Sequence, residues 1–145
     1  MTELHKDLKA LGNSAVNKPL YEKTGVDKTV LERFPNPFMV QNASNCRGTV
    51  VITAPEFSSL CPLTGQPDFA TIVVEYQPGA WCVESKAWKL YLGSFRSQGE
   101  FHESCVNRMC NDLVELLQPT WIRVTGQFTP RGGIAFWPTA YYAAP

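Results

Sequence analysis

One cysteine of the chain has neighbours that suit acid–base chemistry. Cys61 is followed by a proline and then by a Thr-Gly-Gln-Pro turn that leads to Asp68. Because proline stiffens the loop and the turn residues fold the chain back, Asp68 is expected to return toward the thiol. A thiolate that attacks an electrophile needs such a partner to handle the proton. Most unpaired cysteines are buried apolar residues, however, and a loop aspartate often caps a turn, so both interpretations stay open.

His102 and Glu103 form a second candidate group, at the start of a predicted helix. Both could be structural, because a first-turn glutamate complements the helix dipole and a histidine can bond to a backbone group. A carboxylate in a pocket could instead accept hydrogen bonds from the N–H donors of a guanine-like edge. A third interpretation is a zinc site, although the spacing of its ligands matches no standard pattern. Those ligands would be Cys61, His102, Cys105 and Cys110.

Basic residues beside glycines suggest a place for phosphate. Arg131 precedes Gly132 and Gly133 in a predicted turn, where a phosphate could approach the backbone closely. Arg131, Lys86 and Lys89 would neutralise its charge. By itself, a plain hairpin turn with an exposed arginine explains the pattern better. The chain has neither a GxGxxG nor a GxxxxGK[ST] motif, so a Rossmann or P-loop nucleotide site is unsupported.

Two amphipathic helices are predicted to position these residues. In segment 84–96, four apolar residues share one helical face, and most of the cations fall off it. The apolar residues are Trp88, Tyr91, Leu92 and Phe95, and the cations are Lys86, Lys89 and Arg96. The second helix is predicted over 103–117, with Ser104 as its N-cap and Pro119 ending it.

Strands flank the two helices in the sequence. They are predicted over residues 48–54, 70–77, 121–129 and 133–137, with a loop over 55–68, a turn over 130–133 and a short extension of the sheet at 81–83. The order strand, strand, helix, helix, strand, strand predicts an α+β layer: an antiparallel four-stranded sheet with two helices on one face. Pairing between subunits would protect the exposed edges of such a sheet.

Composition sets the class of protein. The 145 residues suffice for one domain with a core that needs no disulfide, and 13 basic residues balance 13 acidic ones. Without a global positive field, duplex nucleic acid and anionic membranes are disfavoured partners. The odd number of cysteines, five, argues against a disulfide framework, and the N-terminus lacks the apolar core of a signal peptide. We expect a cytoplasmic protein with an extended arm over 1–45, containing a helical turn near 29–33, and a catalytic body over 46–145.

Four motifs together resemble a known family, the queuosine-pathway nitrile reductases, which are NADPH-dependent 7-cyano-7-deazaguanine reductases (QueF family). The motifs are Glu84-Ser85-Lys86-Ala87-Trp88-Lys89-Leu90-Tyr91, Ser59-Leu60-Cys61-Pro62-x-Thr64-Gly65-Gln66-Pro67-Asp68, Phe101-His102-Glu103 and Arg131-Gly132-Gly133. The match is to the short, single-module form and runs from about Leu31 to the final strands. It implies a tunnel fold, in which subunits assemble side by side into a barrel, two rings stack, and active sites lie between subunits.

The resemblance also implies a reaction, the reduction of a nitrile to a primary amine by two NADPH during queuosine tRNA modification. Cys61 would form a covalent thioimide with the nitrile and Asp68 would donate the proton, with no metal required. The residues implied in substrate binding are Val83, Glu84, Ser85, His102 and Glu103. Those implied in binding the cofactor are Lys86, Lys89, Arg131 and Gly132.

Two other functions remain as alternatives. One is a zinc-dependent pterin or purine hydrolase of the GTP cyclohydrolase type, which shares the tunnel architecture. The other is a non-catalytic tunnel-fold module that binds a purine or pterin and is indifferent to Cys61. A protective disulfide between Cys61 and Cys105 is a further hypothesis, since Cys105 follows Glu103 by two residues.

Overall fold

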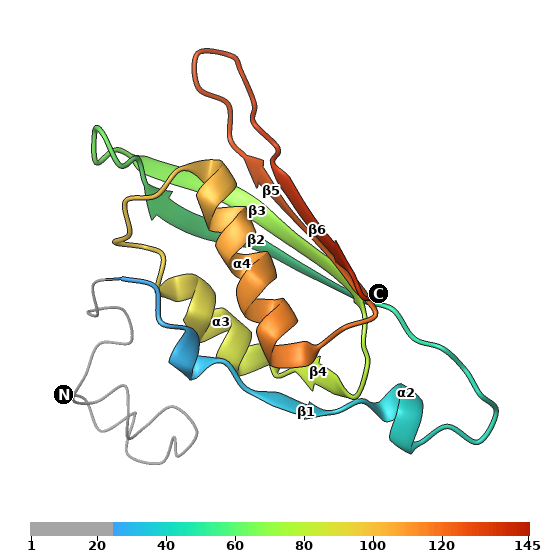
Figure 1. Ribbon diagram of the computed structural model, residues 1–145. Helices are drawn as coiled ribbons and strands as arrows, with labels where there is room; N and C mark the ends of the chain where they lie inside the picture. Colours follow the sequence, from blue (N-terminus) through green and yellow to red (C-terminus); the bar gives the residue numbers. More distant parts are fainter. Residues whose placement is uncertain (1–24) are drawn as a thin grey trace, which may run out of the picture.

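The computed structural model describes residues 25–145, and its centre is one antiparallel sheet covered by two helices (Figure 1). The sheet has the strand order β2-β3-β5-β6, so β2 and β6 are its edges. The strands are β2 (Val50–Leu60), β3 (Pro67–Gln77), β5 (Trp121–Phe128) and β6 (Thr139–Ala143), and the helices are α3 (Ser85–Gly93) and α4 (His102–Leu117). The predicted α+β layer is therefore confirmed.

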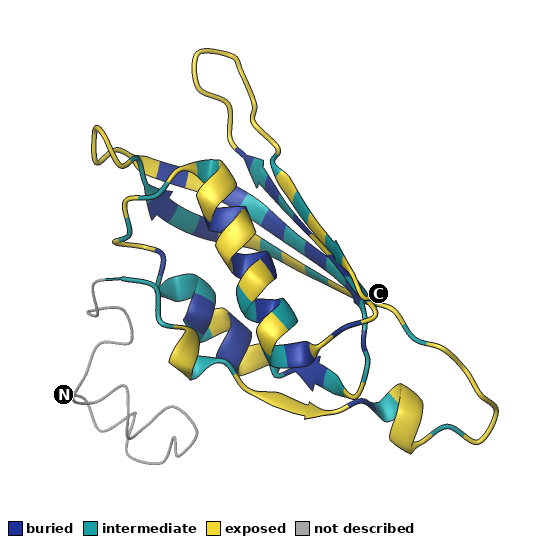
Figure 2. Ribbon diagram, in the orientation of Figure 1, coloured by how far each residue is buried: buried dark blue, intermediate teal, exposed yellow. Residues whose placement is uncertain are grey.

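The core lies between the helices and one face of the sheet. Alternate residues of β3 and β5 are buried, as period-two strands with one covered face require, and Val74 pairs with Val124 at the centre. Figure 2 shows these buried positions alternating with exposed ones along the strands. Among residues 25–145, no helix combines the length and apolar character needed to cross a membrane.

The loop predicted over 55–68 is mostly wrong. The strand β2 continues to Leu60 and β3 already starts at Pro67, which leaves only a short turn between them. The register between β2 and β3 shifts between Ala54 and Phe57, and such an irregularity accommodates Pro55 in an edge strand. As a result Ser59 lies directly opposite Asp68.

Two further strand predictions are also wrong. The last strand lies at 139–143 instead of 133–137, because Pro138 has no N–H to donate to a ladder. The preceding residues still follow β5, since Phe128 donates to the carbonyl of Phe136 at 3.2 Å. The strand β4 (Trp81–Val83) does not extend the main sheet but pairs with β1 (Arg33–Pro35) of the arm.

The described part of the arm packs on the body. It contains the 3-10 helix η2 (Lys28–Val30), slightly earlier than the predicted turn, and the short helix α2 (Pro37–Val40). Asn36 caps α2 and is buried. Its side-chain amide is satisfied there, since it donates to the carbonyl of Gly79 at 2.7 Å. Residues 1–24 of the predicted arm lie outside the described residues.

The predicted apolar face packs on the core, although α3 ends at Gly93, two residues before Phe95. Trp88, Tyr91 and Phe95 are buried, and Leu92 is partly buried against the same core. The helix α4 also agrees, but the predicted cap does not. Its N-cap is Phe101, which makes no side-chain bond, and Ser104 already lies in the first turn.

Candidate active site

The Cys61 thiol sits in the tight turn that joins β2 to β3. The backbone N–H of Cys61 donates to the carbonyl of Gln66 at 2.8 Å, and its carbonyl accepts from Gly65 at 2.9 Å. Gly65 has a φ of 68°, a conformation that glycine adopts without the penalty of a side chain. These bonds hold the half-buried thiol at one end of the sheet.

Donors of the same turn favour the thiolate. Hydrogen bonds from the Thr64 hydroxyl and from the N–H groups of Thr64 and Leu63 lower the pKa of Cys61, and burial and the negative charge of Asp68 oppose them. The Thr64 oxygen also accepts from the N–H of Gln66 at 3.3 Å, which leaves its own hydrogen for the sulfur. A lowered thiol pKa makes more thiolate, the nucleophilic form, at neutral pH.

Replacing Thr64 with valine is therefore expected to raise the pKa of Cys61. Alkylation of Cys61 by iodoacetamide should slow by about threefold to tenfold at pH 7, and its rate profile should move to higher pH. The measurement is the alkylation rate of Cys61 as a function of pH. It is made in a Cys46→Ser background, because Cys46 is exposed and would also react, whereas the other three cysteines of residues 25–145 are buried. Thr64→Ser keeps the hydroxyl and should keep the profile, whereas an unchanged profile in Thr64→Val would contradict the assignment.

The Asp68 carboxylate is buried and has a partner at each oxygen. Its side chain is only 4% exposed, with Oδ1 2.5 Å from Nη2 of Arg131 and Oδ2 3.4 Å from Nε2 of His102. The imidazole of His102 stacks on Phe128, with ring centroids 3.7 Å apart and planes 7° from parallel. The structure thus brings Asp68, His102 and Arg131 into one cluster beside the Cys61 turn.

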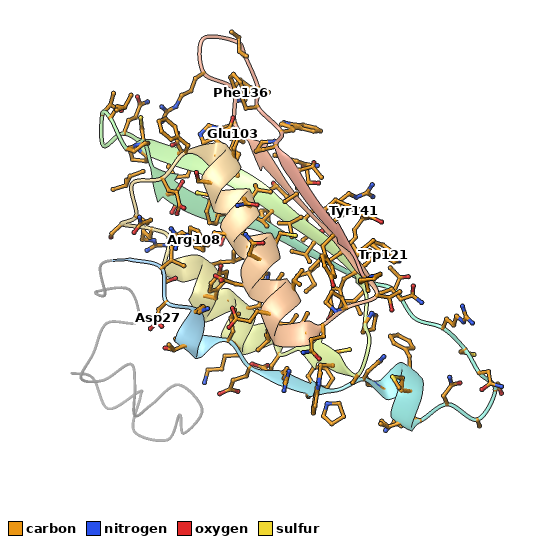
Figure 3. The ribbon with its side chains drawn as sticks, viewed as in Figure 1. Asp27, Glu103, Arg108, Trp121, Phe136 and Tyr141 are labelled. Atoms are coloured by element: carbon orange, nitrogen blue, oxygen red, sulfur yellow. The ribbon has the colours of Figure 1, made fainter. Side chains whose placement is uncertain are left out.

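Glu103 follows His102 in the first turn of α4 and faces the solvent. It is exposed and borders a groove of about 450 Å³ between α4 and β6, which Tyr141 also lines. Figure 3 shows Glu103 and Phe136 together at this end of the helix, and the ring of Phe136 meets His102 at a centroid distance of 6.4 Å. A carboxylate and aromatic surfaces here could receive a planar ring with N–H donors.

The start of α3 holds the other predicted site residues. Glu84 caps the helix by accepting from the N–H groups of Lys86 at 2.9 Å and Ala87 at 2.7 Å, and these bonds lower its pKa. The Ser85 hydroxyl donates to Glu84 at 3.2 Å, and Val83 is buried. Lys86 and Lys89 are exposed on α3.

Within one protomer these two groups of residues are not brought together. Cys61 precedes β3, whereas Val83 and Glu84 come after it, and the strand is 11 residues long. Its ends are on the order of 35 Å apart at the usual rise per residue. Figure 1 likewise shows α3 starting beside β4, away from the hairpin that carries Arg131.

Sequence reasoning missed three residues of the site, namely Thr64 in the Cys61 turn and the two aromatic residues beside His102. Thr64 belongs to the motif that contains Cys61, and its position within the turn is the signal that could have indicated its role. Phe128 and Phe136 contact His102 only through the packing of β5 and the hairpin on α4, for which no local signal exists.

The cysteines of the second helix lie in the core. Cys105 is buried within α4, and this burial raises its pKa to about 12. Cys61 and Cys105 are both free thiols, and the disulfide between them stays a hypothesis. In the part of the chain that the structure describes, no three His, Cys, Asp or Glu side chains are grouped so that they could hold a metal ion.

Known proteins resemble the chain in sequence. A family model described as QueF-like protein matches residues 67–145. A protein of Streptococcus mutans serotype c named NADPH-dependent 7-cyano-7-deazaguanine reductase is 47% identical over 140 residues, covering 97% of this chain and 81% of its own. Proteins with the same name are 48% identical over 145 residues in Bacteroides fragilis (strain ATCC 25285), covering 100% and 89%, and 50% identical over 135 residues in Bacillus subtilis (strain 168), covering 93% and 76%.

A solved structure shares the fold. The crystal structure of the archaeosine synthase QueF-Like in the apo form matches with a TM-score of 0.62 and covers 67% of this chain and 95% of its own. Its sequence is 20% identical, so the likeness concerns the fold alone.

Proposed function

The chain belongs to the QueF-like family, and from this premise we propose that it is an NADPH-dependent nitrile reductase. Its substrate is 7-cyano-7-deazaguanine and its product 7-aminomethyl-7-deazaguanine, in queuosine tRNA-modification biosynthesis. The observation that carries the proposal is the Cys61 turn, in which hydrogen bonds lower the pKa of a half-buried thiol beside a buried aspartate. Relatives 47–50% identical over most of the chain bear the name of this activity.

The covalent step uses Cys61 and Asp68. The Asp68 carboxylate accepts the proton of the thiol, the thiolate forms a C–S bond to the nitrile carbon, and the C≡N bond becomes C=N. Asp68 then gives the proton to the nitrogen, so the product is a neutral thioimide and the carboxylate is restored. The burial of Asp68 supports this role, because it keeps bulk water from exchanging the proton during the transfer.

Reduction of the nitrile to the amine needs four electrons, and two NADPH would each supply one hydride. After the first reduction the C–S bond breaks and Cys61 leaves as a thiolate, which the Thr64 hydroxyl and the N–H groups of the turn stabilise. The second reduction acts on the imine that remains.

The residues present suit the cofactor. Lys86, Lys89 and Arg131 are exposed cations of the kind that pair with phosphates. At Gly132 and Gly133 an added Cβ would meet no atom within 4 Å, so the space over this turn is open to a phosphate. We assign Lys86, Lys89, Arg131 and Gly132 to cofactor binding.

The deazaguanine is held by residues from both ends of β3. Glu103 accepts the N–H donors of the ring and His102 lies against it, at the Cys61 end of the sheet. Val83, Glu84 and Ser85 hold its other side. Because these groups flank opposite ends of a strand on the order of 35 Å long, a second copy of the chain would bring Val83 to Ser85 to the thiol.

Assembly through the sheet edges would bring the two halves together. Within residues 25–145, β2 and β6 each have a neighbouring strand of the main sheet on one side only, and pairing between copies would extend the sheet at these edges. A barrel of such subunits, with two rings stacked, is the assembly we propose. It acts in the cytoplasm, where a catalytic thiol stays reduced.

Mixing two inactive variants tests this shared site. Cys61→Ala lacks the nucleophile and Glu84→Ala lacks the other side of the pocket, so each is expected to be inactive alone. Unfolded together and refolded, they form mixed oligomers in which some sites take both wild-type halves, and NADPH oxidation should return. The matched control is the same treatment of each variant alone. Absence of activity in refolded mixtures that contain both chains would mean that each protomer carries its own complete site.

Stoichiometry tests the reaction itself. Addition of 7-cyano-7-deazaguanine should lower the absorbance of NADPH, with about two cofactors consumed per nitrile, as the electron count requires. One cofactor per nitrile would contradict reduction to the amine.

Metal analysis of protein purified without chelator addresses the hydrolase alternative, which requires stoichiometric zinc. Binding of the purine without any NADPH oxidation would instead support the non-catalytic module.

A further inference from the structure

Arg131, assigned above to the cofactor phosphates, is already engaged by the catalytic carboxylate. Its Nη2 lies 2.5 Å from Oδ1 of Asp68 and donates to the carbonyl of Pro67 at 2.9 Å. Asp68 is 4% exposed, whereas the side chain of Arg131 is 39% exposed. The guanidinium therefore lies between the buried carboxylate and the solvent. From the solvent side an anion could also bind the guanidinium.

A hairpin turn and its bond to β3 together place Arg131 beside Asp68. Arg131 pairs with Ile134 through two backbone hydrogen bonds of 3.0 Å, which close a turn over Gly132 and Gly133. Both glycines have positive φ, 56° and 76°, as a two-residue hairpin turn requires. At the base of the hairpin, the N–H of Thr129 donates to the carbonyl of Phe69 at 2.9 Å. The hairpin is thus bonded to β3 on both sides of Asp68.

We propose that Arg131 is a positioning residue for Asp68, and that a cofactor phosphate binds Arg131 only in competition with this carboxylate. The first part rests on the contacts above, and the second rests also on the proposed function. His102 contacts the other oxygen, Oδ2, so the carboxylate keeps one partner when Arg131 leaves. Cofactor binding would then remove the Arg131 contact from Asp68, the proton-transfer group, before the hydride moves.

Competition has a thermodynamic consequence that can be measured without turnover. If Asp68 and a phosphate compete for one guanidinium, removing the carboxylate must tighten cofactor binding, because the two effects are reciprocal. Asp68→Asn keeps the size of the side chain but removes its charge. It is therefore expected to bind NADP⁺ about fivefold more tightly than the wild type, a typical coupling between linked sites.

The test is a set of NADP⁺ dissociation constants from isothermal titration calorimetry. Arg131→Met should weaken binding, and in that background Asp68→Asn should have no further effect, since the contested group is gone. Lys89→Met is the matched control: it removes another phosphate-binding cation, but Asp68→Asn should still tighten binding there. Unchanged affinity in Asp68→Asn overturns the proposal, and so does an equal gain in the Arg131→Met background, which would mean simple charge repulsion.

A second readout needs no cofactor and separates this inference from the proposed function. The charge of Asp68 raises the pKa of Cys61, and Arg131 offsets that charge. Arg131→Met should therefore slow iodoacetamide alkylation of Cys61 at pH 7 by about threefold, in the Cys46→Ser background, but not when Asp68 is Asn. Equal slowing in both backgrounds overturns the positioning role. Failure of the wild type to bind NADP⁺ refutes the proposed cofactor, and the alkylation cycle then decides the Arg131 contact by itself.

Discussion

Cys61→Ala is expected to lower turnover by at least about a thousandfold and to abolish the covalent adduct, because the proposed C–S bond forms on the Cys61 sulfur. The adduct is detected by intact mass after incubation with 7-cyano-7-deazaguanine in the absence of NADPH. Addition of a thiol to a nitrile loses no atoms, so the mass of the wild-type protein should rise by the whole mass of the substrate.

The matched control for this variant is Cys46→Ser. Cys46 is exposed and lies in the segment between α2 and β2, away from the Cys61 turn, so this variant should form the adduct and turn over normally. Retained adduct in Cys61→Ala, or a loss of adduct in Cys46→Ser as large as in Cys61→Ala, would contradict the assignment of the nucleophile.

Asp68→Asn is expected to slow formation of the thioimide by about 10²- to 10⁴-fold, the usual contribution of a general acid–base group. The amide keeps the volume and an oxygen for Arg131, so binding of the deazaguanine should change little. Stopped-flow measurement of adduct formation gives the rate, and equilibrium titration of the nitrile into protein that also lacks the thiol gives the affinity.

The same variant should react faster, not slower, with a simpler electrophile. The charge of Asp68 raises the pKa of Cys61, so its removal lowers that pKa and extends the thiolate to lower pH. Alkylation by iodoacetamide, which needs no proton donor, should therefore be faster at pH 7 while nitrile addition is slower. Parallel slowing of both reactions would show damage to the turn instead of loss of a proton shuttle.

Local patterns predicted the elements of the protein and its chemical groups. Both helices and three of the four sheet strands lie close to where periodicity placed them, since a buried face imposes its repeat on neighbouring residues. Two of the errors occurred where the chain interacts with backbone outside its local segment. Pro55 is accommodated in β2 by the irregular register with β3, and β4 pairs with an arm strand more than 40 residues earlier. Neither partner is visible in a local window.

For the site, the sequence by itself determined which residues could carry the chemistry, because Cys61 and Asp68 are only seven residues apart with turn-forming residues between them. Only the tertiary structure decided how they are set. Arg131 reaches the carbonyl of Pro67 across 64 residues of chain, and it does so because β5 aligns with β3 and the glycine turn holds the arginine over Asp68. A contact between residues so far apart depends on strand register and packing, which side-chain types alone do not specify.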